Sequence, residues 1–421
     1  MFTPCLFARA CAFLPLAFAV VVHAGDREPA PLTLAEAEQL ALAHQPQLAA
    51  ARAGVSATRH DADAAGSLPD PMLTTGVTDF PVDGDSRFST RRNDFTMYTI
   101  GVEQDFPLAA KRELRQKKGQ LVADRAGQML DAASRMVGRE SKLAWLDRWQ
   151  SERELALAQA AQRAAESSHQ AADIAYRAGR APQSDLLAAS VAAELVQDEV
   201  AQLGASVDKA KPMMARWVGE ADAQRPLADA PPDSQPPALD AMLAGLSKHP
   251  EMAAVLLEQN LAEAETGMAR ADYRPDWSVG VEYGYRPLFS DFISVNFKVG
   301  LPFFTAHRQD PRLAAAQEQM KGAEQSAEDT RRRLSADVSS TYAEWASLRD
   351  RLARFDTLVV PQAEAGATAA ERAYAAGSGS VSALLNARQA SLAAQRMRVR
   401  LFADRERAAA RLAYYTPGSQ P

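Results

Sequence analysis

Side chains that could bind a metal ion are thinly spread along this sequence. The histidines after residue 24 never lie three or four residues apart, the spacing that would put two ligands on one helical face. His44 and His249 stand in the similar tripeptides HQP and KHP, where packing at a helix end is the better interpretation. Methionine sulfur can bind Cu(I), but Met72, Met97 and the pair at 213–214 form no cluster, which favours core filling. We therefore expect no metal site.

Sequence motifs for catalysis are also missing. We find no nucleotide-binding loop, hydrolase nucleophile elbow or HExxH zinc motif, which favours a protein that is not an enzyme and needs no cofactor. The net charge is -6 and the basic residues are mixed with acidic ones, so nucleic acid is not an expected partner.

Turn-forming and charged residues gather in two similar stretches, YRAGRAPQSDLL at 176–187 and YAAGSGSVSALL at 374–385. Such agreement between segments 198 residues apart indicates an internal repeat. The six matching positions of twelve are Tyr176 with Tyr374, Ala178 with Ala376, Gly179 with Gly377, Ser184 with Ser382, and Leu186 and Leu187 with Leu384 and Leu385.

Each stretch is predicted to reverse the direction of a helix. Gly179 and Gly377 can take the left-handed conformation that ends one helix, while Ser184 and Ser380 can cap the next one. Pro182 lies near the first turn of the new helix, where proline is tolerated.

The two predicted reversals differ in charge. The first contains Arg177, Arg180 and Asp185, whereas the second contains no charged residue. Arg180 can pair with Asp185, although Asp185 can equally act only as an acidic residue that favours the start of a helix. Any electrostatic function should therefore be built from the first copy.

Long helices must position these turns. No proline occurs between Pro107 and Pro182, and the intervening residues are strong helix formers, which predicts a helix about 100 Å long. A second long helix is predicted from Pro311 to about Ala376, with a kink or break at Pro361. In the helix after the first turn, apolar residues step by four and three as in a coiled-coil seam. They are Val196, Val200, Leu203, Val207, Ala210, Met214 and Trp217.

Before each long helix, apolar and polar residues alternate as they do in β-strands. The alternation is clearest at 277–285 and 293–301, and it recurs at 98–106 with a less regular partner at 72–80. One apolar face and one polar face are typical of a barrel strand in lipid, although a half-exposed antiparallel sheet fits the pattern equally well. Four strands are too few to close a barrel, whereas three chains would supply twelve.

The beginning of the chain predicts export. Residues 1–24 combine Arg9, an apolar run and a small-x-small sequence that ends at Ala24, as in a cleaved signal peptide. A lipoprotein would need a cysteine directly after the cleavage motif, but Cys5 and Cys11 both lie within the predicted signal, so we expect no lipid anchor. After residue 24 no apolar run is long enough for a transmembrane helix, so membrane entry would require a closed barrel.

The repeat predicts how the rest of the chain is divided. Each copy would contain a leading helix, a strand pair, a long helix, the reversal and a return helix. The expected segments are a first structural repeat at 25–222 with strands at about 69–107, a proline-rich linker at 223–237, a second repeat at 238–416 with strands at about 275–302, and a short tail at 417–421.

This duplicated order resembles the TolC family of trimeric outer-membrane efflux ducts over about residues 32–416. The resemblance implies a mainly α fold with β, in which three chains form a 12-stranded outer-membrane β-barrel continued into a periplasmic α-helical barrel. It also implies a homotrimer in contact with outer-membrane lipid of a Gram-negative bacterium, with a periplasmic adaptor (a membrane fusion protein) and an inner-membrane RND pump as partners. The stretches at 69–73, 96–115 and 273–283 are similar to the channels of heavy-metal RND pumps, those for copper and silver or for cobalt, zinc and cadmium.

In the TolC family the two reversals form a periplasmic tip that closes like an iris. The resemblance implies that Asp185 ties the first reversal to the second and that Tyr374 lies on the other side of this tie. Ala383 and Asn386 stand where aspartates line the constriction, and Gly379 stands where a latch arginine lies, which predicts a weaker resting closure. The predicted tip and gate residues are Tyr176, Gly179, Arg180, Asp185, Leu186, Tyr374, Gly377, Leu384 and Asn386.

The leading hypothesis is therefore a passive, trimeric outer-membrane exit duct for heavy-metal cations delivered by a pump and its adaptor. A channel for drugs or other organic solutes is the alternative. A periplasmic coiled-coil adaptor or scaffold is less favoured, because adaptors typically carry one helical hairpin within separate β domains, whereas two hairpins alternate with two strand pairs here.

Overall fold

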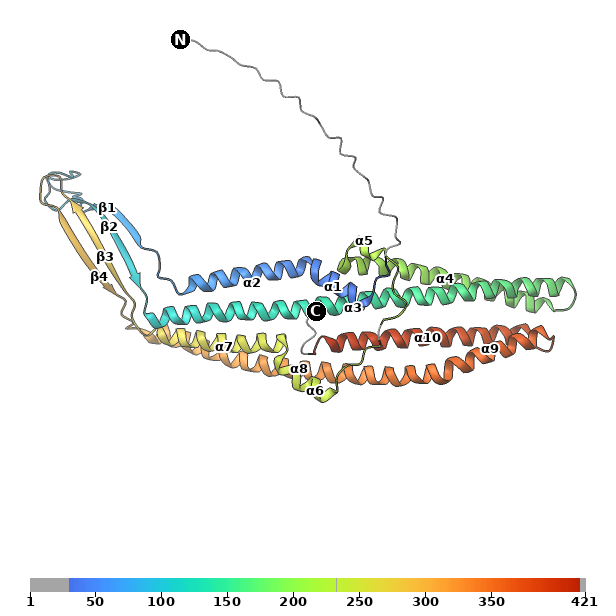
Figure 1. Cartoon of the computed structure of the whole chain (residues 1–421). Helices are drawn as coiled ribbons and strands as arrows, with labels where there is room; N and C mark the ends of the chain where they lie inside the picture. The colour runs from blue at the N-terminus through green and yellow to red at the C-terminus, as the bar shows by residue number, and fades with distance from the viewer. Residues whose placement is uncertain (1–29, 232, 417–421) are drawn as a thin grey trace, which may run out of the picture.

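The computed structural model describes residues 30–231 and 233–416 and shows an elongated molecule (Figure 1). A four-stranded sheet lies at one end, two helix reversals lie at the opposite end, and the main apolar core lies between them. The predicted signal peptide and the tail at 417–421 lie outside the described residues.

Two successive sets of elements follow the same order, so the predicted duplication of the fold is confirmed. The first set contains α1 (Leu34–His44), α2 (Pro46–Ala65), β1 (Met72–Thr78), β2 (Met97–Phe106), α3 (Ala109–Arg177), α4 (Gln183–Val218) and the short α5 (Glu220–Ala223). The second set contains α6 (Leu239–Gly245), a 3-10 turn (Leu246–Lys248), α7 (Pro250–Ala271), β3 (Trp277–Tyr285), β4 (Phe292–Val299), a second 3-10 turn (Thr305–His307), α8 (Gln309–Arg354), a π-helical turn (Phe355–Val359), α9 (Val360–Ala375) and α10 (Val381–Ala413).

Each leading helix is divided in two, which corrects the prediction of a single helix. Pro46 begins α2 and Pro250 begins α7, each as the first residue of its helix. A proline ring disfavours the helical conformation of the residue before it, and Gln45 and His249 are accordingly extended, with ψ of 118° and 137°. His249 also caps α7, because its Nδ1 accepts a hydrogen bond from the Glu251 amide at 3.3 Å. The predicted helix-end role of His249 is thus confirmed.

The two long helices differ in continuity. Helix α3 runs unbroken for 69 residues, as the absence of proline predicted. The corresponding helix of the second set is divided into α8 and α9 by the five-residue π turn. Pro361 is the second residue of α9. Proline lacks the amide that would continue the hydrogen-bond ladder, which explains why the predicted break falls here. No helix among the described residues is both long and apolar enough to span a bilayer.

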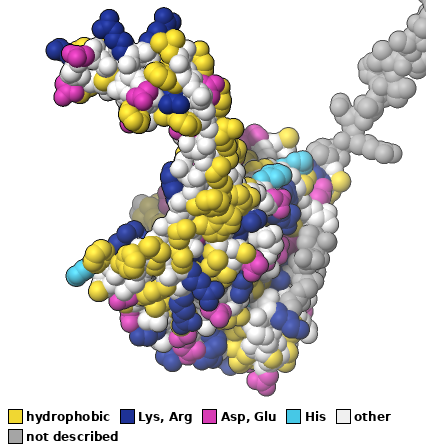
Figure 2. All heavy atoms as spheres, turned by 90° about the vertical axis from the view of Figure 1, so that its left-hand side faces the viewer, with side chains coloured by type: hydrophobic (Ala, Val, Ile, Leu, Met, Phe, Trp, Pro, Cys, Tyr) yellow, Lys and Arg dark blue, Asp and Glu magenta, His cyan; other side chains and the backbone are white. Residues whose placement is uncertain are grey.

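The strands form one antiparallel sheet in the order β1, β2, β3, β4, so β2 and β3 join the two halves of the chain. Its exposed face is the apolar one: side chains such as Ile100 and Val281 are exposed, whereas Thr99, Gly101 and Ser278 are buried. Figure 2, which views the molecule from the sheet end, shows hydrophobic side chains gathered along the sheet. This arrangement is the reverse of a water-soluble sheet, where the apolar face is covered.

Buried apolar side chains from both halves fill the middle of the molecule. Trp145 of α3 is fully buried and donates from its indole nitrogen to the Leu32 carbonyl at 3.0 Å. Leu32 also pairs with Leu227 in a parallel bridge, which holds the start of the described chain against the segment between the two sets of elements. The core therefore fixes the helices from which both reversals extend.

Candidate functional site

The two helix reversals lie side by side at the end of the molecule remote from the sheet (Figure 1). A small apolar cluster joins them: Ala172 of α3, Ala189 of α4 and Val381 of α10 are buried together, with Tyr374 of α9 and Leu385 packed against them. All four helices thus contribute to one structure, which we call the tip.

Both reversals have the same backbone. Gly179 and Gly377 adopt positive φ angles of 66° and 72°, as the sequence predicted. In each turn the glycine amide bonds the carbonyl three residues earlier, at 2.9 and 3.0 Å. The next amide bonds the carbonyl five residues earlier, again at 2.9 and 3.0 Å. These paired bonds are the Schellman motif, which satisfies the carbonyls left open at a helix end.

The helices that leave the two turns begin differently. Ser380 caps α10, because its hydroxyl accepts a hydrogen bond from the Ala383 amide at 3.2 Å, as predicted. The prediction that Ser184 caps α4 is wrong: the helix already begins at Gln183, and no side chain caps it. Pro182 occupies the cap position instead, which places Ser184 inside the first turn.

The charges of the first reversal do not pair as the sequence suggested. Arg177 pairs with Asp173 one turn earlier on α3, at 2.9 Å. Among the residues that the structure describes, Arg180 and Asp185 form no ion pair with each other or with another group. Asp185 is half-buried in the first turn of α4, where its charge complements the positive end of the helix dipole.

The predicted tie between the two reversals concerns Asp185 and Tyr374. Within the described residues no hydrogen bond joins them, and the Tyr374 ring belongs to the apolar cluster of the tip. The other predicted tip residues lie around this cluster with different exposures. Leu384 is buried, Leu186 is half-buried, and Tyr176 and Asn386 are exposed.

Gly379 has a packing role that the sequence comparison did not reveal. A Cβ atom at this position would lie 2.9 Å from the Tyr374 backbone nitrogen, closer than normal contacts allow. The second turn therefore packs its backbone against the end of α9, and a side chain at position 379 would require this backbone to shift.

Sequence reasoning missed Arg388, which lies one turn beyond the repeated stretch. Its guanidinium donates to the Ser168 hydroxyl at 2.6 Å and to the Ala164 carbonyl at 3.2 Å, both on α3. It also bonds Glu371 of α9 at 2.9 Å. Extending the comparison of the two copies past residue 385 would have exposed a charged residue near the otherwise uncharged second turn.

A second set of charges joins the two hairpins closer to the middle. Glu154 of α3 is 3% exposed and accepts hydrogen bonds from Arg400 of α10 at 2.9 and 3.0 Å and from Gln150 at 2.7 Å. Burial opposes ionisation of Glu154, but these hydrogen bonds outweigh it and hold the pKa of the carboxyl below its ordinary value. Glu154 is therefore a charged link between the two halves.

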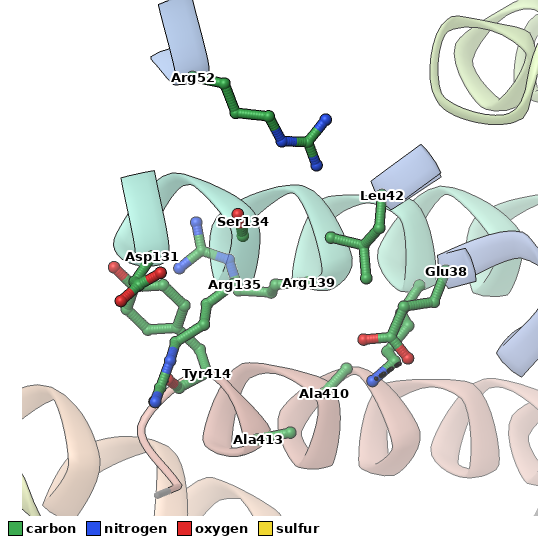
Figure 3. Close-up of a pocket in the computed structure, with 11 residues that line it drawn as sticks. Glu38, Leu42, Arg52, Asp131, Ser134, Arg135, Arg139, Ala410, Ala413 and Tyr414 are labelled. Atoms are coloured by element: carbon green, nitrogen blue, oxygen red, sulfur yellow. Dashed lines mark hydrogen bonds and ion pairs between the residues drawn. The ribbon is translucent and has the colours of Figure 1, made fainter. Parts of the chain in front are cut away.

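One hollow lies far from the tip, between α1, α2, α3 and α10, and has a volume of about 330 Å³ (Figure 3). Its charged side chains are largely engaged in the fold. Lys142 pairs with Glu38 at 2.8 Å, and Arg135 donates to the Thr416 carbonyl at 3.0 Å. Within residues 30–231 and 233–416, no group of three histidine, cysteine, aspartate or glutamate residues is arranged to hold a metal ion.

Comparison with known proteins identifies the fold. The solved structures that match this chain include a membrane protein from Pseudomonas aeruginosa. Its TM-score is 0.79, with 17% identity over 91% of this chain and 92% of that one. The outer membrane protein VceC from Vibrio cholerae matches with a TM-score of 0.76 and 20% identity, over 90% of this chain and 94% of that one. CusC matches with a TM-score of 0.76 and 15% identity, over 98% and 99% of the two chains.

A family model supports the same assignment from sequence. Among curated proteins no match was found. The model described as outer membrane efflux protein matches residues 38–220 and 244–416, which together make up most of the chain and include both reversals and both strand pairs. This is a family of efflux proteins rather than of enzymes. The chain therefore belongs to the outer membrane efflux protein family.

Proposed function

We propose that this protein is the passive outer-membrane exit duct of a tripartite efflux system and works as a homotrimer. The observation that carries the proposal is the four-stranded sheet, whose apolar face is exposed and whose polar face is buried. Phe297 and Ile293 of β4 are each 73% exposed, and most apolar side chains on the same face of β2 and β3 are also exposed. A contiguous apolar face of this kind is costly in water but stable against lipid tails.

The opposite face of the sheet suits a water-filled interior. Glu103 accepts hydrogen bonds there from Lys298 at 2.6 Å and from Ser278 at 3.0 Å. These charged and hydroxyl groups lie among glycines, so the face is polar. Polar residues inside and apolar residues outside are the pattern of a transmembrane barrel.

One chain leaves the sheet open at both edges, β1 and β4. Unpaired strand edges cannot be tolerated in lipid, because their backbone groups have no water to bond. With four strands in each chain, three copies would close a barrel of twelve. In that assembly the three tips would surround one periplasmic opening, and Tyr176, Gly179, Arg180, Asp185, Leu186, Tyr374, Gly377, Leu384 and Asn386 would form or flank the gate.

We further propose that the duct serves heavy-metal cations delivered by an inner-membrane RND pump through a periplasmic adaptor. Support comes from the sequence stretches at 69–73, 96–115 and 273–283, which are similar to those of heavy-metal channels. Selection would then be made by the pump, and the duct would provide a non-specific lumen.

The proposal can be tested both with the protein and with a deletion strain. Detergent-extracted outer membranes should yield a heat-modifiable trimer, and the purified trimer should conduct ions in planar bilayers. Recovery of the protein in the soluble periplasmic fraction would contradict the channel function. For the substrate, a deletion strain should become sensitive to metal salts and regain tolerance from a plasmid copy. A strain sensitive only to drugs would replace the metal assignment with organic-solute efflux.

A further inference from the structure

Exposed aromatic side chains gather where the sheet joins the helices. Trp277 begins β3 and stacks on Phe106, the last residue of β2, with 4.4 Å between the ring centroids. Beyond the end of β4, Phe303 and Phe304 are 76% and 79% exposed. Strands β2, β3 and β4 have eight to ten residues, close to the length that crosses the core of a bilayer. In the proposed assembly these rings therefore mark the edge of the lipid on the side of the helices.

Three arginines lie close to these aromatic residues in the sequence. Arg274 lies three residues before Trp277, while Arg308 and Arg312 lie four and eight residues after Phe304. All three are exposed, and among the described residues none of their guanidinium groups has a hydrogen-bond or ion-pair partner. Figure 2 shows Lys and Arg side chains beside hydrophobic ones where the sheet meets the helices.

The acidic residues nearest to these arginines in the sequence have other partners. Lys111 of α3 pairs with Asp276 at 2.8 Å and with Asp272 at 3.8 Å. Asp310 of α8 accepts a hydrogen bond from the Tyr273 hydroxyl at 2.5 Å. These contacts fasten the end of α7 to the starts of α3 and α8. The positive charge of the three arginines is thus left without a partner in the chain.

The start of α8 does not account for its two arginines. Arg308 is the N-cap residue, and Arg312 is the fourth residue of the helix. The positive end of the helix dipole disfavours cations at both places, and no side chain caps this helix. The two arginines therefore serve another purpose than the stability of α8.

We propose that Arg274, Arg308 and Arg312 bind the phosphate groups of anionic phospholipids at the membrane surface. The inference rests on the proposed insertion of the sheet and names the lipid class that its helix-side edge takes. A guanidinium group can bind two phosphate oxygens through paired hydrogen bonds. Basic residues beside a membrane-facing apolar surface are attracted to a negatively charged leaflet. Because the rings lie among the headgroups while the arginines hold the phosphates, this contact fixes how deeply the sheet lies in the bilayer.

The fluorescence of Trp277 reports the lipid that lies at this edge. The purified full-length protein is placed in vesicles of equal parts phosphatidylcholine and phosphatidylglycerol, with bromine on the acyl chains of one lipid or of the other. Bromine quenches only nearby indoles, and the other four tryptophans lie in or against the helical core. Trp145 and Trp345, for example, lie about 54 Å along α3 and α8 from the sheet end. Trp277→Phe gives the background signal.

The quenching should show an about threefold preference for phosphatidylglycerol, because each arginine near the surface attracts anionic lipid. Arg308→Gln combined with Arg312→Gln should remove most of this preference, and Arg274→Gln should lower it less. Arg351→Gln combined with Arg354→Gln is the matched control and should keep the preference. Both control residues are exposed arginines at the far end of α8 without a side-chain partner among the described residues.

Equal quenching by the two brominated lipids in the unmodified protein would overturn the inference and leave the insertion of the sheet intact. A preference that survives the loss of Arg308 and Arg312 would overturn it as well. The same holds for an equal loss in the control pair, which would show a response to the overall charge of the protein.

A salt series on the unmodified protein gives the test if the double variant does not fold. In about 1 M salt, charges more than about 3 Å apart are screened, so the preference for phosphatidylglycerol should disappear. A preference that persists in this salt would contradict binding by the arginines. If neither brominated lipid quenches Trp277, the sheet lies outside the bilayer, and the proposed function fails together with this inference.

Discussion

The two helical hairpins share a backbone reversal but are held in different ways. Both turns are Schellman motifs with a glycine at positive φ. The first hairpin reaches its turn through an unbroken helix, whereas the second reaches it through α8, a π turn and α9. The first turn carries Arg180 and Asp185, and the second is uncharged but is followed by Arg388.

This difference teaches that duplication preserved the backbone geometry more strictly than the side-chain chemistry. A glycine is needed in each turn because a side chain at positive φ is strained. No comparable constraint fixes the charges, so the links between the hairpins arise where helices happen to face each other. Glu154 supplies such a link from the first hairpin, and Arg388 supplies one from the second.

The largest effect is expected from removing the buried link on the first hairpin. Glu154→Ala removes a buried carboxylate that accepts two hydrogen bonds from Arg400 and one from Gln150, and it should lower the free energy of unfolding by about 3 kcal/mol. Glu166→Ala, an exposed position on the same helix, should have little effect. Thermal loss of helical circular dichroism in detergent measures both, and equal midpoints would show that the link contributes nothing.

The same link predicts a dependence on pH. The folded state lowers the pKa of Glu154 below its ordinary value of 4.5, so ionised Glu154 stabilises the fold above that pH. This contribution is lost as pH falls through the lowered value. Glu154→Gln should therefore reduce the difference in stability between pH 7 and pH 3, and an unchanged acid profile would contradict the assignment.

A smaller effect is expected from adding one carbon atom to the second turn. Gly379 corresponds to Ala181 in the first copy, yet a Cβ at Gly379 would lie 2.9 Å from the Tyr374 nitrogen. Gly379→Ala should cost about 2 kcal/mol because backbone must move, whereas Ala181→Gly should cost less than 1 kcal/mol. The two thermal midpoints test this asymmetry, and equal costs would mean that the turns pack alike.

The caps of the two return helices should differ by about 1 kcal/mol. Ser380→Ala removes the hydroxyl that accepts from the Ala383 amide, while Ser184→Ala removes no cap. The first substitution should lower the thermal midpoint slightly and the second should leave it unchanged. A loss of stability in Ser184→Ala would show that the Ser184 hydroxyl stabilises the protein although it does not cap α4.

The smallest effect is expected at the charged turn. If Asp185 contributes to a gate, Asp185→Ala should change the open fraction or the cation preference of the channel by about a factor of two. Asp198→Ala removes an exposed carboxylate from the same helix and serves as the control. If Asp185→Ala and Asp198→Ala change the channel equally, Asp185 has no role in the gate and only stabilises the start of α4.

Much of the fold could be predicted because its signals are local. The alternation at 277–285 and the proline-free run after Pro107 each specify an element without reference to the rest of the chain. The break at Pro361 was predictable for the same reason. The division of each leading helix was missed although Pro46 and Pro250 mark it, because the helical pattern continues across both prolines.

The contacts at the tip could not be predicted in the same way. The three acceptors of Arg388 lie up to 224 residues away in sequence, and no local pattern specifies such a distance. The need for Gly379 depends on how closely its turn approaches the end of α9, which sequence alone does not give. The cap predicted at Ser184 was misplaced by two residues, since the helix begins at Gln183 and Pro182 holds the cap position.

The central claim is that the apolar face of the sheet lies in the outer membrane. Asn296 and Phe297 are neighbours on β4, so their side chains lie on opposite faces of the sheet. Asn296 pairs with Gly280 on the polar face. The chain has two cysteines, both within the predicted signal peptide, so single cysteines can be introduced cleanly. In intact outer membranes, a water-soluble maleimide should label Asn296→Cys and spare Phe297→Cys. Equal labelling of both positions, or labelling of Phe297→Cys alone, would contradict the account.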